Sequence, residues 1–104
     1  MVIKSVLREE LRNSLRMKKN YENELRKLKK GSLHAKKIKG HTYYYLILRK
    51  MGKFKLEYKG KLSKKEIEEY INAKKLREKY TKLLSKTKQQ IAFLRKSLRG
   101  KEEV

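Results

Sequence analysis

The apolar positions of this chain change their spacing at residues 31 and 63. Residues 3–30 contain neither glycine nor proline, and one set of positions recurs there at spacings of four and three. Five of the seven positions in this set are apolar: Leu7, Leu11, Ser14, Lys18, Tyr21, Leu25 and Leu28. Such a stripe predicts a helix over residues 1–30 with a coiled-coil-like seam, ended by Gly31. Ser14 and Lys18 interrupt the stripe, so we expect a looser or partly polar contact at its middle.

A second stripe begins after residue 63. Ser63 and Glu66 have the spacing of a capping box, which predicts the start of a helix. The stripe runs through nine positions, seven of them apolar: Tyr70, Ala73, Arg77, Tyr80, Leu84, Thr87, Ile91, Leu94 and Leu98. Five more apolar residues are expected to widen it: Ile67, Ile71, Leu76, Leu83 and Phe93. We therefore predict a second helix over residues 63–99, ended by Gly100, and a frayed tail over residues 100–104.

The stretch between the two stripes, residues 31–62, has a different composition. It holds four of the five glycines and four of the seven tyrosines, which sets it apart from the Leu- and Lys-rich flanks. The dipeptides Lys39-Gly40 and Met51-Gly52 are turn signals. They separate three segments, 32–39, 41–50 and 53–61, whose Tyr, Ile, Leu, Thr and Phe content favours strands. Short turns and alternating side chains predict an antiparallel meander.

Together these elements predict an α+β fold. Two long helices form an antiparallel coiled-coil-like hairpin, with a three-stranded antiparallel β-sheet between them in the sequence. At 104 residues the chain is expected to be a single domain over residues 1–104. The two seams are satisfied if the helices pair within one chain. Pairing with a second copy in a homodimer stays open, because so narrow a core leaves little apolar surface to bury.

Net charge narrows the range of functions. Lys and Arg number 32 against 11 Asp and Glu, a formal net charge of +21. Self-repulsion of this size disfavours compaction, and a partner that carries negative charge would relieve it. Clustered Lys and Arg at this density are typical of nucleic-acid-binding proteins. The alternative is a very basic but solvated helical surface with no polyanionic partner.

Aromatic and basic residues are interleaved in the predicted sheet. One face is expected to rest on the helices, while the other presents Tyr43, Tyr45, Arg49, Lys55 and Lys59. Cations suit phosphates and rings suit bases or sugars, and a ribbon of this size fits a DNA major groove, which favours DNA over RNA. The tyrosines could instead pack the sheet, and the lysines could deter edge-to-edge aggregation. The candidate nucleic-acid-binding residues are Lys36, Lys37, Lys39, Tyr43, Tyr45, Arg49, Lys50, Lys53, Lys55 and Lys59.

Several chemical functions lack the residues they need. The chain has no cysteine, which excludes disulfides and Cys-ligated zinc. His34 and His41 have no evident third metal ligand, and no nucleophile, paired-carboxylate or phosphate-cradling glycine motif is present. We therefore expect neither an enzyme nor a metal or other cofactor. The N-terminus has no apolar core of signal-peptide length, and the apolar run 43–48 is far too short to span a bilayer, so a soluble cytoplasmic protein is expected.

Residues 31–63, GSLHAKKIKGHTYYYLILRKMGKFKLEYKGKLS, resemble the centre of a group of uncharacterised small bacterial and archaeal proteins. Those proteins combine a helix, a Gly-Ser strand, a Tyr-rich strand, a Gly-Lys strand end and a second long helix, and are often linked to mobile elements. The same stretch is more weakly similar to the three-stranded arm-site DNA-binding domain of tyrosine recombinases. That second resemblance implies a sheet that enters the major groove.

Two functional hypotheses follow. In the first, the protein binds nucleic acid, with duplex DNA ahead of RNA, through the sheet and the adjacent helix lysines. In the second, the helical hairpin is a protein-interaction module, or an inhibitor that acts on a nucleic-acid-handling partner of a mobile element or defence system. Neither hypothesis involves a membrane.

Overall fold

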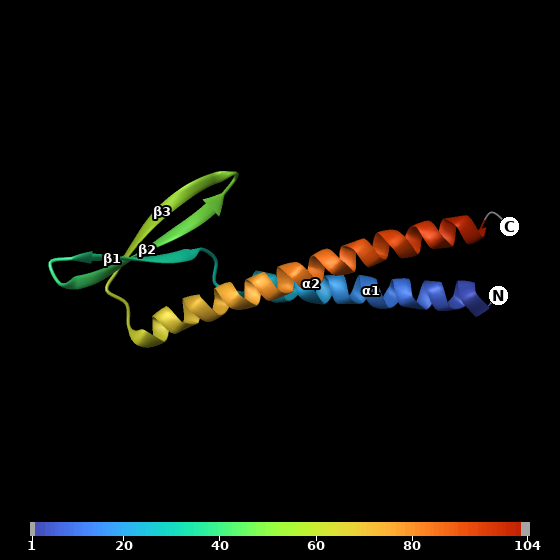
Figure 1. The fold of residues 1–104 in the computed structure, drawn as a ribbon, viewed down its shortest axis with the longest axis horizontal. Coiled ribbons are helices and arrows are strands. Elements are labelled where there is room, and N and C mark those ends of the chain that lie inside the picture. The colour runs from blue at the N-terminus through green and yellow to red at the C-terminus, as the bar shows by residue number, and fades with distance from the viewer. Residues whose placement is uncertain (1, 103–104) are drawn as a thin grey trace. The chain divides into compact units, whose positions relative to one another are not determined.

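The structure is a computed structural model that describes residues 2–102 (Figure 1). Its elements are α1 (Val2–Lys27), β1 (Ser32–Ile38), β2 (His41–Lys50), β3 (Lys53–Gly60) and α2 (Lys64–Glu102). The predicted α+β class, a three-stranded antiparallel sheet between two helices in the sequence, is confirmed. The chain forms two compact units, one made of α1 and the part of α2 from Glu78 onward, the other of Leu28–Arg77. No helix in the described part of the chain is apolar over a membrane-spanning length.

In the first unit, α1 and the later turns of α2 run antiparallel (Figure 1). The predicted seam is the buried one, with Ile91, Leu94 and Leu98 each at most 7% exposed. Tyr21 and Tyr80 meet across it with ring centroids 6.0 Å apart. The two helices therefore bury their apolar stripes against each other within one chain.

The structure tests two expectations about the stripes, and the expected widening of the α2 stripe is wrong in part. Ser14, where a looser or partly polar contact is expected, is only 2% exposed, so the contact is partly polar but is not open to solvent. Thr87 is also buried, and its hydroxyl donates a 2.8 Å hydrogen bond to the carbonyl of Leu83. Among the residues expected to widen the stripe of α2, three are exposed instead: Ile71, Leu76 and Phe93. The buried stripe of α2 is therefore narrower than its apolar composition suggests.

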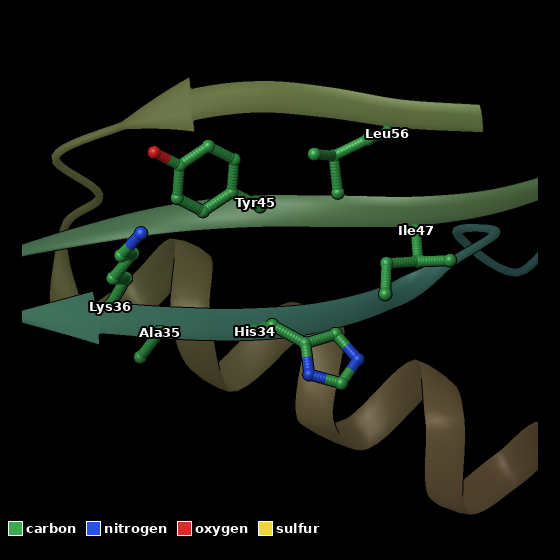
Figure 2. A pocket seen from close by; sticks show the side chains of 6 residues that line it. All are labelled: His34, Ala35, Lys36, Tyr45, Ile47 and Leu56. Atoms are coloured by element: carbon green, nitrogen blue, oxygen red, sulfur yellow. The ribbon is translucent and has the colours of Figure 1, made fainter.

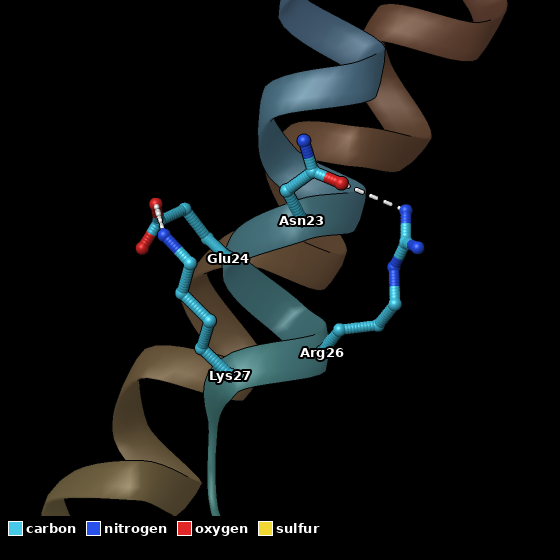
Figure 3. A network of polar contacts seen from close by, with 4 residues as sticks. All are labelled: Asn23, Glu24, Arg26 and Lys27. Atoms are coloured by element: carbon cyan, nitrogen blue, oxygen red, sulfur yellow. Dashed lines mark hydrogen bonds and ion pairs between the residues drawn. The ribbon is translucent and has the colours of Figure 1, made fainter.

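Both helix ends differ from the prediction by about three residues. The last turn of α1 carries Arg26 bonded to Asn23 at 2.7 Å and Lys27 paired with Glu24 at 3.4 Å (Figure 3). The helix then stops at Lys27, before Gly31. Gly100 does not end α2 but lies inside it, since the helix continues to Glu102. Of the predicted tail, residues 103–104 lie outside the described part of the chain.

The start of α2 confirms the capping box. The backbone N–H of Glu66 donates to the Ser63 hydroxyl oxygen at 3.2 Å. The same hydroxyl donates to the carboxylate of Glu66 at 3.1 Å. One free backbone donor of the first turn is thereby satisfied, and a negative charge lies at the positive end of the helix dipole.

The second unit is built on a sheet with strand order β1-β2-β3 and antiparallel pairing throughout. Each hairpin closes with two residues in the left-handed region: Lys39 (φ 52°) with Gly40 (φ 80°), and Met51 (φ 51°) with Gly52 (φ 77°). Positive φ at both residues is the signature of the type I′ turn, whose twist matches that of a hairpin. The sequence predicted glycine at one position of each turn. Lys39 and Met51 are the additional strained positions.

The segment between α1 and β1 is fastened to the first turns of α2. The Arg77 guanidinium donates two hydrogen bonds of 3.0 Å, to the carbonyl oxygens of Lys29 and Gly31. The Lys29 ammonium pairs with Glu69 at 3.0 Å and lies 4.7 Å from the ring centroid of Tyr70. The hydrogen bond from Lys29 holds the pKa of Glu69 below its usual range. This pair therefore stabilises the fold at neutral pH, and its contribution is lost as the pH falls through the lowered pKa.

We predict that Arg77→Leu lowers the free energy of unfolding by about 1–3 kcal/mol, because two carbonyl groups lose a charged donor. Arg77→Lys should recover only part of this loss, since an ammonium does not reproduce the planar fork of the guanidinium. Urea unfolding followed by circular dichroism measures the effect. The control is Arg95→Leu on the exposed side of α2, for which a change within about 0.5 kcal/mol is expected. Equal effects of the two leucine variants would contradict the role given to Arg77.

We also predict that Met51→Asn stabilises the chain by about 0.5–1 kcal/mol. Met51 is fully exposed and holds a φ that asparagine adopts at lower cost, so the substitution relieves strain without loss of packing. A higher urea midpoint is the expected result. Met17→Asn on α1 is the comparison variant, and it should lower the midpoint because asparagine is a poor helix former. An unchanged or lower midpoint for Met51→Asn would refute the prediction.

Candidate functional site

The strand register sorts the side chains of the sheet into two different faces. Residues directly opposite each other on antiparallel strands point to the same side. Tyr45 opposes Tyr58, Ile47 opposes Leu56, and Arg49 opposes Phe54. On the β1 side, His34 opposes Tyr45 and Lys36 opposes Tyr43. We call this side the aromatic face, and it consists of Ser32, His34, Lys36, Ile38, His41, Tyr43, Tyr45, Ile47, Arg49, Phe54, Leu56 and Tyr58.

The expected arrangement of this face is wrong for β3. Lys55 and Lys59 were expected beside Tyr43, Tyr45 and Arg49. Instead Lys55 opposes Leu48 on the other side of the sheet, and Lys59 falls at an irregularity between the Tyr45–Tyr58 and Tyr44–Gly60 pairs. The turn explains the difference, because a two-residue loop puts Arg49 opposite Phe54. That information was present in the sequence, in the length of the Met51-Gly52 turn.

The ten candidate residues therefore do not form one cluster. Four lie on the aromatic face: Lys36, Tyr43, Tyr45 and Arg49. Lys39 occupies the first turn, and Lys59 occupies the irregularity in β3. The remaining four point to the opposite side: Lys37, Lys50, Lys53 and Lys55. Sequence reasoning missed His34, Phe54, Leu56 and Tyr58 as members of this face.

The opposite side of the sheet is buried at its centre. The first turns of α2 lie behind the sheet when the aromatic face is viewed from the front (Figure 2). Leu46 points to that side and is only 4% exposed. Gly31 packs so closely there that a Cβ would come within 2.7 Å of the Leu46 side chain. The centre of this side, around Leu46, is therefore the small core of the unit, and the aromatic face is left open.

The aromatic face is unusually apolar for an exposed surface. Phe54 is 75% exposed, Leu56 64% and Tyr58 60%. Tyr58 lies between two rings, with its centroid 5.2 Å from that of Tyr45 and 6.5 Å from that of Tyr43. The Arg49 guanidinium lies 5.7 Å from the centroid of the Phe54 ring. The face thus offers a tilted row of rings with cations beside it.

An open hollow of about 490 Å³ occupies part of this face (Figure 2). Tyr45, Ile47 and Leu56 form its apolar side, and His34, Ala35 and Lys36 line it from β1. Its volume lies in the range of small-ligand sites, about 300–1,000 Å³. The hollow therefore combines one aromatic ring with two polar side chains from the neighbouring strand.

No acidic residue belongs to the aromatic face. The single acid of residues 31–62 is Glu57, which lies on the other side of the sheet and accepts a 2.9 Å hydrogen bond from Lys59. This hydrogen bond holds the pKa of Glu57 below its usual range and raises that of Lys59, so both stay charged at neutral pH. The positive charge of Lys36 and Arg49 has no acid on its own face to offset it.

The described residues do not form a metal site. No group of three or more His, Asp and Glu side chains in residues 2–102 is placed to hold a metal ion. His34 and His41 lie on the same side of the sheet but are not cross-strand partners, since His41 opposes Ile38.

Comparison with known proteins gives no match to a family model, a curated protein or a solved structure. The resemblances inferred from residues 31–63 stay predictions.

A pair of engineered cysteines tests the register of this face. Lys50 and Lys53 flank the two-residue turn, so Arg49 and Phe54 form the next, non-hydrogen-bonded pair, with Cα atoms about 4.5 Å apart. That spacing suits a disulfide. Because the chain has no natural cysteine, Arg49→Cys with Phe54→Cys should lose both free thiols on mild oxidation. Arg49→Cys with Lys55→Cys should keep them, and the reverse pattern would overturn the assignment of faces.

Proposed function

We propose that the protein binds nucleic acid and that the aromatic face of the sheet is its contact surface. One observation carries the proposal. A row of exposed rings lies beside Lys36 and Arg49 on a sheet face without any acid, in a chain with a net charge of +21. Exposed cations neutralise phosphates and release their counterions, while exposed rings pack against bases or sugars.

The charge of the second unit supports the same proposal. Lys37, Lys50, Lys53 and Lys55 are exposed on the opposite side of the sheet, and Lys39 is exposed in the first turn. These side chains raise the local positive potential without facing the ligand. Their contribution is long-range attraction, which depends on ionic strength, whereas Lys36 and Arg49 are placed for direct contact with a bound strand.

An electrophoretic shift assay tests this function. Mixed-sequence DNA, both as a duplex and as a single strand, is titrated with protein at about 50 and 200 mM salt. We predict binding that weakens steeply with salt. Lys36→Glu with Arg49→Glu should reduce affinity at least about tenfold and lower the salt slope by about two, one for each lost phosphate contact.

The matched control reverses the same number of charges on the other side of the sheet, by Lys37→Glu with Lys55→Glu. This pair should cost clearly less affinity, because it alters only the surrounding potential. Circular dichroism checks that both variants stay folded. Equal losses in the two pairs would refute the aromatic face as the contact surface. No shift at the lower salt concentration for either form of DNA, or for the same sequence as RNA, would refute nucleic-acid binding itself.

A further inference from the structure

The aromatic face lacks a covering layer in the structure, and its composition indicates what would cover it. Phe54, Leu56 and Tyr58 are each at least 60% exposed and follow one another on the same side of β3. A continuous apolar surface of this kind marks a binding site more often than a solvated face. Its occupant must bring flat apolar groups for the rings and negative charge for Lys36 and Arg49.

A second copy of the chain would supply apolar rings, but it would not supply negative charge. Two aromatic faces packed together would bring Lys36 and Arg49 of each copy close to those of the other, with no acid on either face. Each copy also carries a net charge of +21, so long-range repulsion opposes the encounter. Charge complementarity therefore favours a polyanion.

Duplex DNA carries the required negative charge, but it does not present flat apolar groups to the rings. In a duplex the flat faces of the bases are stacked on one another, and the grooves present polar base edges between phosphates. A sheet that enters the major groove reads these edges through hydrogen-bonding side chains. The aromatic face carries Ile47, Phe54 and Leu56, whose side chains donate and accept no hydrogen bonds. Their burial against polar base edges would bring little stabilisation.

Unpaired nucleotides meet both requirements. We infer that the aromatic face binds single-stranded nucleic acid, with bases stacked on Tyr45, Tyr58 and Phe54 and with phosphates against Lys36 and Arg49. The hollow beside Tyr45 has room for a base, and Lys36 lines the same hollow (Figure 2). Stacking on rings is tolerant of sequence because every base has a flat π face. This inference rests on the proposed function and names its substrate class.

The experiment compares ligands of equal length by fluorescence anisotropy. The ligands are a labelled mixed-sequence DNA strand, the same sequence as RNA, the DNA duplex, and inorganic polyphosphate as a competitor without bases. We expect either single strand to bind at least about tenfold more tightly than the duplex, and polyphosphate to compete poorly. The two single-stranded ligands then show whether the sugar matters. Quenching of tyrosine fluorescence in the unmodified protein reports stacking directly, since the chain has no tryptophan.

Ring removal separates stacking from charge. Phe54→Leu and Tyr58→Leu keep an apolar side chain and the net charge, and each should weaken single-strand binding about 5- to 100-fold while the salt slope is unchanged. Tyr58→Phe should bind like the unmodified protein. The control is Phe93→Leu, which removes an exposed ring from α2 and should leave binding unchanged.

The outcomes distinguish the two proposals. Tighter binding of the duplex, competition by polyphosphate at equal phosphate concentration, or full affinity in the ring variants would overturn the single-strand inference and leave nucleic-acid binding standing. Absence of binding to every nucleic acid at low salt would overturn both. Intact circular dichroism in the ring variants, expected because both rings are exposed, excludes unfolding as the cause of a loss.

Discussion

A two-residue turn determines the chemistry of the sheet. Met51 and Gly52 both adopt positive φ, which places Lys50 opposite Lys53 and Arg49 opposite Phe54. From there the period of two along each strand carries Phe54, Leu56 and Tyr58 to the side of Tyr43 and Tyr45. A shift of one residue would replace these apolar side chains with Lys55 and Glu57. The exposed row of rings is thus a consequence of turn length, and the turn maintains it at the cost of a strained methionine.

The two sides of the sheet differ in how far their apolar side chains are buried. Leu46 is buried on one side, and Arg77 fixes the incoming segment by its bonds to Lys29 and Gly31. Because Gly31 has no side chain, the side chain of Leu46 can pack directly against its backbone. No further element of Leu28–Arg77 remains to cover the rings. Their exposure therefore follows from the topology of this unit.

The elements were predictable because each depends on local pattern, whereas the site depends on pairing between segments. Stripe spacing identified both helices and the buried positions Thr87, Ile91, Leu94 and Leu98 of the α2 seam, and glycine turns identified the three strands. The width of the α2 stripe was overestimated, since Ile71, Leu76 and Phe93 are exposed. Gly100 was misjudged as a stop, because glycine merely permits a helix end and does not impose one. The apolar members of the aromatic face were missed because β3 was assigned to the wrong side.

In this chain the net charge and the exposed apolar surface have to be interpreted together, because each narrows the set of partners that the other would allow. A row of rings on a neutral domain would favour self-association, and a net charge of +21 opposes it. Lysines on a sheet could serve only to block edge-to-edge pairing, which accounts for Lys37, Lys53 and Lys55 on the edge strands β1 and β3. It does not account for Arg49, on the central strand beside Phe54. The combination of both features on one open face is the basis for proposing a ligand that is polyanionic and presents flat rings.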